Sequence, residues 1–516
     1  MWFSVVILPN MLSFHSKRRD GDGPHPRKEP RFPVPVQAKK IEEIFSDCDD
    51  FETRQIRVGL QSRIAVQVCW LDGVVSGSDV SEDILRPLTA CDRLAQVSSS
   101  REAVRLIEQG AVYSYSVKTR TEMDDVISDL TAGHAALVFD GLRLAVTFEV
   151  RTENVRQISE AAIEKSVKGA RDAFVETLRI NTSLVRRRIH SPGLKIRQTV
   201  VGRQSETGVA VVYLEGIADE ARVQEVLDRL NAIDIDAVLG IGDLEPYLVN
   251  HPHSPFPQMG HTERPDKFAS ALLDGRIGLL ADGLPLGFVL PGTLGLLMHA
   301  PEDNGRHFAV ASALTLLRYL ALLLSLTLPA LYVAIAMYHP EMIPAKLLLS
   351  VIQAEQEVPF STPIIILSML IAFELLQEAG LRLPDPIGQT VSIIGALLVG
   401  EAAVNAKVAS PIAIIVVALA GIAGYNIPNQ ELGSTLRLLR FALVLSSILA
   451  GMFGLTAALA LLVWHLCTLE NEGVAYLSPF VDSETSPLFH TLLRKPQQDY
   501  KFRDPTLVRR NRRRQR

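Results

Sequence analysis

The sequence predicts an α/β soluble N-terminal region of two related subdomains, followed by an α-helical multi-pass transmembrane domain. Apolar side chains make up 48% of the 516 residues, and the mean hydropathy of +0.20 is high for a soluble chain. Only six lysine or arginine residues lie between Phe308 and Leu466, whereas charged and apolar residues mix throughout the preceding sequence. A strand-and-helix pattern also occurs twice before residue 307. These observations divide the chain into a soluble part and a membrane part.

Residues 1–50 are expected to form a disordered segment rich in proline and arginine. The opening "MWFSVVILPNMLSF" is too short to span a bilayer, and the basic "KRR" follows it, whereas a signal peptide carries its charge first. The next run, "GDGPHPRKEPRFPVPVQ", cannot bury a core. We therefore expect the soluble region to lie in the cytoplasm. The four cysteines, which have no metal-ligand spacing, agree with a reducing compartment.

Two stretches of the soluble region resemble each other and predict two α/β subdomains. "IAVQVCWLDGVVSGSDVSEDILRPL" and "VAVVYLEGIADEARVQEVLDRL" both run from a strand pattern into a helix pattern. Each is followed by two apolar runs around Asp-Gly, which predicts a hairpin. Asp72 precedes Asp140 by 68 positions, and Glu215 precedes Asp282 by 67. We expect cytosolic subdomains over residues 51–154 and 191–307, joined by a helical connector over residues 155–190.

The sequence does not predict an enzyme. It contains no phosphate-cradling GxxxxGK[ST] motif, no GxGxxG after a strand, no GxSxG elbow and no HExxH. His251, His253 and His261 lie among prolines without partnering cysteines or an acidic pair, so a polar loop is favoured over a metal site. No cofactor and no nucleic-acid partner are expected.

Residues 308–468 are predicted to form a transmembrane domain with four to five membrane helices. The apolar stretches cover residues 319–338, 363–384, 387–406, 411–428 and 441–466. Arg437 and Arg440 place the start of the last stretch in the cytoplasm, while the tail over residues 469–516, basic at its end, places the end there. A single crossing cannot satisfy both. The number of crossings therefore stays open.

Two carboxylates stand out in "PIIILSMLIAFELLQEAGLRLP". Glu374 and Glu378 are one helical turn apart, and Arg382 follows one further turn along the same face. A charge at the centre of a bilayer costs roughly 2.5–3.5 kcal/mol, so these side chains need compensation. One interpretation is a helix end at the membrane interface, with Glu378 paired to Arg382. The other is a face that lines a wet pathway, where carboxylates attract cations.

Glu401 and Lys407 lie at the end of the stretch "GALLVGEAAVNAKVASP", close to an expected turn. Near a helix end, long charged side chains reach the interface at little cost, which favours a structural role. The small residues that precede them permit close helix packing. Both residues are nevertheless candidates for an effect on conduction or gating.

Several separated motifs resemble the GerA family of spore germination proteins, in its A-subunit class. The resemblance covers residues 54–480 and rests on "GARDAFVETLRINTSLVRRRI", "SPFPQMGHTERPDKFASALLDGRIGLLADGLP", "PFSTPIIILSMLIAFELLQEAGLRLPDPIGQTVSIIGALLVGEAAV" and "SPIAIIVVALAGIA". The most specific runs are FELLQEAGLRLP and TERPD, which consists of Thr262, Glu263, Arg264, Pro265 and Asp266.

The resemblance implies a membrane protein of the spore inner membrane that works with B and C germinant-receptor subunits. It also implies a homo-oligomer, expected as a pentamer, that acts as a nutrient-gated channel for monovalent cations within membrane lipid. Ala170, Ala173 and Lys407 depart from residues that are usual in the family. These departures leave two assignments open, a receptor A subunit and a SpoVAF-like relative. The alternative functions are a membrane-anchored scaffold or signal-relay subunit and, less favoured, a secondary transporter.

Overall fold

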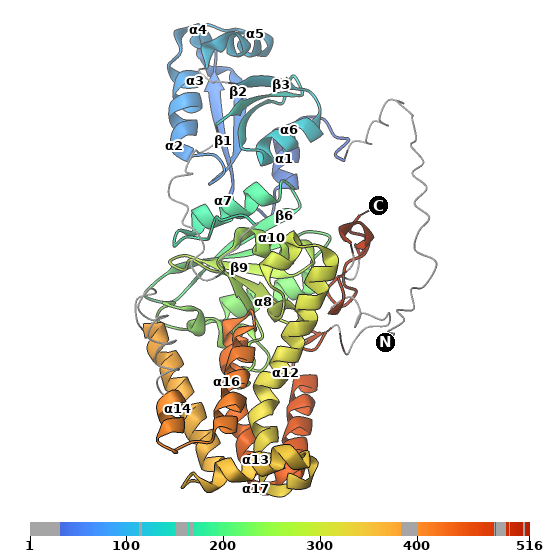
Figure 1. The fold of residues 1–516 in the computed structure, drawn as a ribbon. Coiled ribbons are helices and arrows are strands. Elements are labelled where there is room, and N and C mark those ends of the chain that lie inside the picture. The colour runs from blue at the N-terminus through green and yellow to red at the C-terminus, as the bar shows by residue number, and fades with distance from the viewer. Residues whose placement is uncertain are drawn as a thin grey trace, which may run out of the picture.

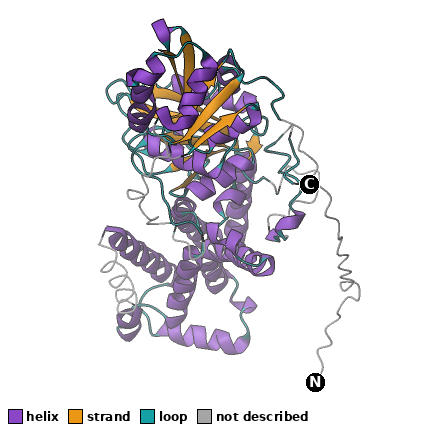
Figure 2. Cartoon of the chain, turned by 90° about the horizontal axis from the view of Figure 1, so that it is seen from above, coloured by secondary structure: helices purple, strands orange, loops and turns teal. Residues whose placement is uncertain are grey.

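The computed structural model describes residues 31–112, 116–150, 164, 169–382, 400–478, 480, 492–494, 496–508 and 511–515. Two sheet-containing units lie one above the other, and a helix bundle extends from the second (Figure 1). Figure 2 shows that the larger strands are confined to these units, whereas the bundle is helical. The predicted fold class, an α/β soluble region followed by membrane helices, is confirmed.

The first unit is a five-stranded sheet with helices on both faces. Its strands lie in the order β1-β2-β4-β5-β3, with bounds β1 (Phe51–Val58), β2 (Ile64–Leu71), β3 (Val117–Arg120), β4 (His134–Phe139) and β5 (Leu144–Glu149). After α2 (Gly77–Asp79), one face packs against α3 (Arg86–Ala90), α4 (Asp92–Ala95) and α5 (Ser100–Leu106). The opposite face packs against α1 (Ala38–Ile44) and α6 (Met123–Thr131). Alternate residues of each strand therefore enter two separate cores.

The second unit repeats this plan. Its strands lie in the order β6-β7-β9-β10-β8, with bounds β6 (Leu194–Val201), β7 (Thr207–Leu214), β8 (Gly260–Thr262), β9 (Ile277–Ala281) and β10 (Gly287–Leu290). One face packs against α8 (Glu220–Asn231) and α9 (Glu245–Leu248). The other packs against α7 (Leu178–Arg188) and α10 (Pro265–Leu273). The short α11 (Leu294–Leu297) follows β10.

The equal strand order of the two sheets confirms that the subdomains are related. The hairpins predicted at the two Asp-Gly pairs are also present, as β4–β5 and β9–β10. Gly283 supplies the left-handed backbone conformation, with φ +81°, in the second hairpin. In the first hairpin Arg143 adopts it instead, with φ +55°. That turn has four residues between the paired Phe139 and Leu144, and its left-handed residue is the last of them.

The predicted connector over residues 155–190 is helical only in its last part, α7, among its described residues. Residues 169–177 form no helix. Phe174 is fully buried there, and its backbone N–H donates to the carbonyl of Glu263 at 2.7 Å. The Asn181 amide also exchanges hydrogen bonds with the backbone of Val175. Residues 169–177 are therefore held in a non-helical conformation by these contacts with the second unit. Most of residues 155–168 lie outside the described part of the chain.

A buried ion pair joins the two units. The guanidinium of Arg186 on α7 donates to both carboxylate oxygens of Asp50 at 2.7 Å and to the carbonyl of Leu194 at 2.9 Å. The two side chains are only 1% and 4% exposed. Beside them, Cys48 pairs in parallel with Ile196 of β6. The residues that lead into the first sheet therefore extend the edge of the second one.

The membrane part contains α12 (Phe308–Tyr338), α13 (Ala345–Gln356), α14 (Thr362–Arg382), α16 (Pro411–Tyr425) and α17 (Gln430–Thr468). Within the described residues, three helices are long and apolar enough to cross a membrane, namely Phe308–Tyr338, Thr362–Gly380 and Gln430–Thr468. The shorter α16 is also apolar. α13 lies at the end of the bundle farthest from the sheets (Figure 1). Most of the predicted stretch 387–406 lies outside the described residues.

α17 is a helical hairpin. The hydroxyl of Thr435 donates to the carbonyl of Pro255 at 2.5 Å, while His465 hydrogen-bonds the neighbouring Ser254 at 3.0 Å. A straight helix would separate residues 435 and 465 by about 45 Å. The chain reverses where Ala450 and Gly451 leave the helical conformation. The apolar stretch over residues 441–466 is therefore not one straight helix, but contains the turn and parts of both arms. The reversal also removes the charge conflict, because both ends of a hairpin lie on one side.

The end of the chain returns to the second unit. After the two-residue strands β11 (Glu470–Asn471) and β12 (Val474–Ala475), the backbone carbonyls of Thr506 and Leu507 accept hydrogen bonds from Arg222. Arg514 forms an ion pair with Asp274 at 2.8 Å. At least this arginine of the basic tail is therefore bound to protein.

The substitution Arg186→Gln tests the buried ion pair. It leaves the Asp50 carboxylate buried without its guanidinium, so we expect a loss of about 3–5 kcal/mol in the free energy of unfolding. Chemical denaturation of the full chain in detergent measures this. Arg203→Gln is the control, because Arg203 and Asp234 form an ion pair whose side chains are 65% and 63% exposed. Equal effects of the two substitutions would contradict a dominant role for the Asp50 pair.

Candidate functional site

Arg440 is a buried arginine inside the membrane bundle. It lies about midway along the first arm of α17 and is only 3% exposed. Its Nε donates to the carbonyl of Ser325 on α12 at 2.8 Å, and its Nη2 donates to the Ser325 hydroxyl at 2.6 Å. Nη2 also lies 3.4 Å from the carbonyl of Ala420 on α16. One guanidinium therefore connects three apolar helices through neutral oxygen acceptors.

Arg437, one helical turn before Arg440, connects α17 to α14. Its Nη1 donates to the amide oxygen of Gln377 at 2.8 Å. Its Nε lies 3.3 Å from Oε1 of Glu374, with 28% and 40% of the two side chains exposed. The two arginines and Glu374 carry a net charge of +1. We refer to Ser325, Glu374, Gln377, Arg437 and Arg440 as the polar cluster.

Glycines on α16 allow the helices around the polar cluster to approach closely. A Cβ atom at Gly421 would lie 2.5 Å from the ring of Phe373 on α14. At Gly424 it would lie 3.2 Å from the Ser325 hydroxyl and 3.5 Å from Nη2 of Arg440. A cavity of about 30 Å³ remains between these glycines, Gln377 and the two arginines. It has room for about one water molecule.

The residues predicted from the sequence do not form one site. Glu374 belongs to the polar cluster, and the side chain of Glu378 is exposed on α14. The side chain of Arg382 lies outside the described part. Glu401 is exposed, and Lys407 forms an ion pair with Glu357 at 3.2 Å, with 63% of each side chain exposed. Roles for Glu378, Arg382, Glu401 and Lys407 in conduction stay predictions.

The TERPD motif forms a clasp within the soluble region. Arg264 is 1% exposed and donates to both carboxylate oxygens of Asp266, at 3.0 and 2.6 Å. It also donates to the carbonyl of Glu164, whose carboxylate accepts hydrogen bonds from Thr262 and Lys267. Burial raises the pKa of Asp266, but the hydrogen bonds and charge of Arg264, the backbone N–H of Lys267 and the charge of Arg188 together lower it by more, so the pKa is lowered overall. The contacts of this motif hold the segment that precedes α7.

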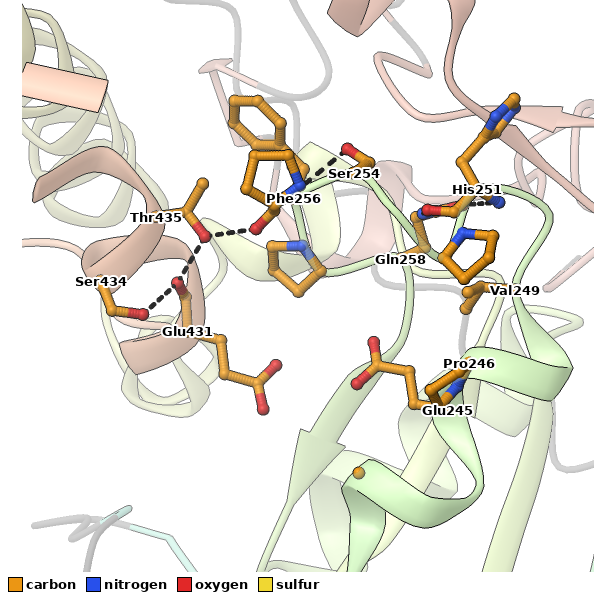
Figure 3. Close-up of a pocket in the computed structure, with 14 residues that line it drawn as sticks. Glu245, Pro246, Val249, His251, Ser254, Phe256, Gln258, Glu431, Ser434 and Thr435 are labelled. Atoms are coloured by element: carbon orange, nitrogen blue, oxygen red, sulfur yellow. Dashed lines mark hydrogen bonds between the residues drawn. The ribbon is translucent and has the colours of Figure 1, made fainter. Parts of the chain in front are cut away.

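A second cavity, which we call the junction cavity, lies where the soluble region meets the bundle, and it has a volume of about 280 Å³. Figure 3 shows the carboxylates of Glu245 and Glu431 on facing walls. Nδ1 of His261 lies 3.5 Å from Glu431, and this contact raises the pKa of His261. Burial and the nearby Glu431 charge raise the pKa of Glu245. Glu431 belongs to the first turn of α17, so this cavity and the polar cluster share a helix.

Sequence reasoning missed most of the polar cluster. In the sequence Arg437 and Arg440 indicate only topology, because the continuous apolar stretch begins after them, at Phe441. The structure begins α17 at Gln430, which places Arg440 inside the bundle. Two arginines one turn apart, next to an apolar run, were the available signal. Ser325 and Gln377 gave none, because single polar residues are common in membrane helices.

The substitution Gly421→Ala tests the close packing around the polar cluster. Its methyl group would overlap the Phe373 ring, so we expect a loss of about 1–3 kcal/mol in stability, measured by thermal unfolding in detergent. Adding Phe373→Leu should recover part of this loss. Gly433→Ala is the matched control, because an added Cβ meets nothing within 4 Å. If both alanine variants melt alike, the proposed overlap does not determine packing.

The sequence matches the family model described as Bacillus/Clostridium GerA spore germination protein over residues 39–506. It is 36% identical over 457 residues to "Uncharacterized membrane protein YfkQ" of Bacillus subtilis (strain 168), covering 87% of this chain and 88% of that protein. It is 34% identical over 473 residues to "Spore germination protein KA" of the same organism, covering 91% and 86%.

A solved structure, the N-terminal domain of the A subunit of the Bacillus megaterium spore germinant receptor GerK3, is 27% identical. It covers 50% of this chain and 97% of that one, with a TM-score of 0.40. The family match spans both sheet-containing units and the membrane bundle. The chain belongs to the GerA family of spore germination proteins.

Proposed function

We propose that this chain is an A-type subunit of a germinant receptor and that its membrane bundle forms part of a gated path for monovalent cations. In this proposal several copies assemble, with B and C partner subunits, in the spore inner membrane, and the two sheet units face the cytoplasm. Family membership and the names of the relatives support the germination role. The Glu374 carboxylate, the one negative charge of the polar cluster, supports a path for cations.

Charged groups in a membrane bundle are costly and are retained mostly where they serve a function. The Glu374–Arg437 pair bridges α14 and α17, so its two partners sit on helices that can separate. While paired, the Glu374 carboxylate is neutralised and attracts no cation. When the pair opens, the carboxylate becomes available to a passing cation. The pair therefore acts as an electrostatic restraint on the closed state.

α17 provides a mechanical route from the soluble region to this pair. Its first turn carries Glu431, which faces the junction cavity, and Thr435, which is hydrogen-bonded to Pro255. Arg437 follows within the same rigid helix. A movement of the loop that contains Pro255 would shift Arg437 relative to Glu374. A signal received by the soluble region or by a partner subunit could thus open the ion pair.

A scaffold without a conduction path is the alternative, and one observation favours it. The Glu374–Arg437 pair lies within a single chain and would also serve simply to hold α14 against α17. In that case removing the charge of Glu374 and removing the charge of Arg437 should change potassium release in the same direction. The gating proposal requires opposite effects, because Glu374 attracts cations and Arg437 restrains Glu374.

Potassium release from spores distinguishes the two functions. We expect Glu374→Gln to slow germinant-triggered release, because the path loses a cation-attracting charge. We expect Arg437→Gln to raise release without germinant, because Glu374 loses its restraint. Effects on the order of tenfold correspond to about 1.4 kcal/mol in the barrier. Release is measured at equal protein abundance, checked by immunoblot.

The exposed residue Glu341, which pairs with His339, provides the control. Glu341→Gln should leave both triggered and spontaneous release unchanged, because its side chain is 70% exposed and outside the polar cluster. The charge swap Glu374→Arg with Arg437→Glu completes the design. Full recovery by the swap, or a parallel loss in both single variants, would reject gating by this pair and support the scaffold.

A further inference from the structure

Glu472 is a buried carboxylate in the turn of the small hairpin formed by β11 and β12. It is 4% exposed, and neither carboxylate oxygen has a hydrogen-bond partner among the residues that the structure describes. Its backbone is left-handed, with φ +52°, as is that of Gly473, with φ +70°. Such turns favour glycine, asparagine or aspartate. A glutamate here carries two penalties, an unfavourable backbone and an unpartnered acid.

The hairpin connects the membrane bundle to the second unit. It follows the last residue of α17, and the Asn471 side chain donates to the carbonyl of Gln258 at 3.3 Å. The carbonyl of Tyr476 accepts a hydrogen bond from Leu294 at 2.9 Å. The Tyr476 ring also lies 5.9 Å from the ring of Phe256, beside the junction cavity. Docking of the hairpin therefore fixes the second arm of α17 to the soluble region.

The charged groups that act on Glu472 come from α8. Arg222, Glu225 and Arg229 lie along this helix, and Arg229 forms an ion pair with Glu225 at 2.5 Å. The guanidinium of Arg222 donates hydrogen bonds to the backbone carbonyls of Thr506 and Leu507. Burial, reinforced by Glu225 and opposed by the two arginines, raises the pKa of Glu472 to about 8. The acid is therefore largely neutral at neutral pH.

We propose that this hairpin is a proton-dependent latch, which docks on the second unit while Glu472 is protonated and loosens when the carboxylate ionises. An ionised carboxylate without hydrogen bonds is far more costly to bury than the neutral acid. The hairpin can relieve that cost by turning Glu472 into water. The second arm of α17 then loses its attachment through Asn471 and Tyr476.

The direction of the pH effect follows from the two protonation states. In the open hairpin Glu472 should titrate near the ordinary pKa of about 4.3, and in the docked hairpin near 8. Between these two pH values, Glu472 is therefore protonated in the docked state and ionised in the open state. Docking is strongest below about pH 4.3 and weakens up to about tenfold per pH unit until about pH 8. Above that pH no further change is expected.

Hydrogen exchange of the full-length protein in lipid nanodiscs tests the latch. The opening equilibrium is obtained from the backbone amides of residues 471–476 between pH 5.5 and 8.5, after correction for the intrinsic exchange rate. In the wild type we expect opening to increase by up to about tenfold per pH unit. Glu472→Gln should abolish this dependence. Glu470→Gln is the matched control, because Glu470 is exposed in the same hairpin and should retain the dependence.

A second substitution keeps the test informative if Glu472→Gln does not fold. Glu225→Gln removes a neighbouring negative charge that raises the pKa of Glu472, so the pH at which opening levels off should fall. A pH-independent wild-type hairpin, or a Glu225→Gln profile identical to the wild type, would overturn the proposal. The measurement needs no ion flux, so its outcome does not depend on the proposed channel function.

Discussion

The reversal of α17 determines how the soluble region and the membrane bundle meet. At Gly451 the backbone has φ +58° and ψ −136°, and an added Cβ would lie 2.8 Å from the ring of Tyr338. Glycine is the residue that tolerates both conditions. The Tyr338 hydroxyl closes the reversal by donating to the carbonyl of Ile448 at 2.7 Å. Because of this turn, both arms of α17 return to the loop that contains Ser254 and Pro255.

Two buried arginines in this chain are stabilised in different ways. Arg186 has a buried carboxylate partner, so its pair is neutral and serves to fix two units together. Arg440 instead has no carboxylate acceptor in these contacts, and its guanidinium donates hydrogen bonds to neutral oxygen atoms of Ser325 and Ala420. A neutral pair would be the cheaper way to hold helices, and removing one partner would be strongly unfavourable. The retained positive charge of Arg440 therefore fits an electrostatic role better than a purely structural one.

The soluble fold was largely predictable, whereas the polar cluster was not. Apolar alternation and the spacing of Asp72, Asp140, Glu215 and Asp282 indicated the duplication, because the same pattern of strands and turns recurs at nearly equal intervals. Hydropathy could not reveal the reversal at Gly451, because a helical hairpin and a single helix have the same apolar content. Likewise the carboxylate of Glu374 finds its partner on another helix, and no local pattern specifies that contact. TERPD was visible as a motif, but its role as a clasp depends on a distant segment.

The two attachments of α17 differ in what would release them. The first arm is held to the Pro255 loop by a hydroxyl of Thr435, whose hydrogen bond does not depend on pH in the neutral range. The second arm is held by His465 and by the hairpin that buries Glu472, which is sensitive to protons. Loss of the second attachment alone would leave Arg437 and Arg440 bound to the loop through the first arm. A displacement of that loop would then act on the polar cluster with less restraint from the second arm. In this arrangement the β11–β12 hairpin determines how strongly the second arm is restrained, and the loop that contains Pro255 is the part that moves.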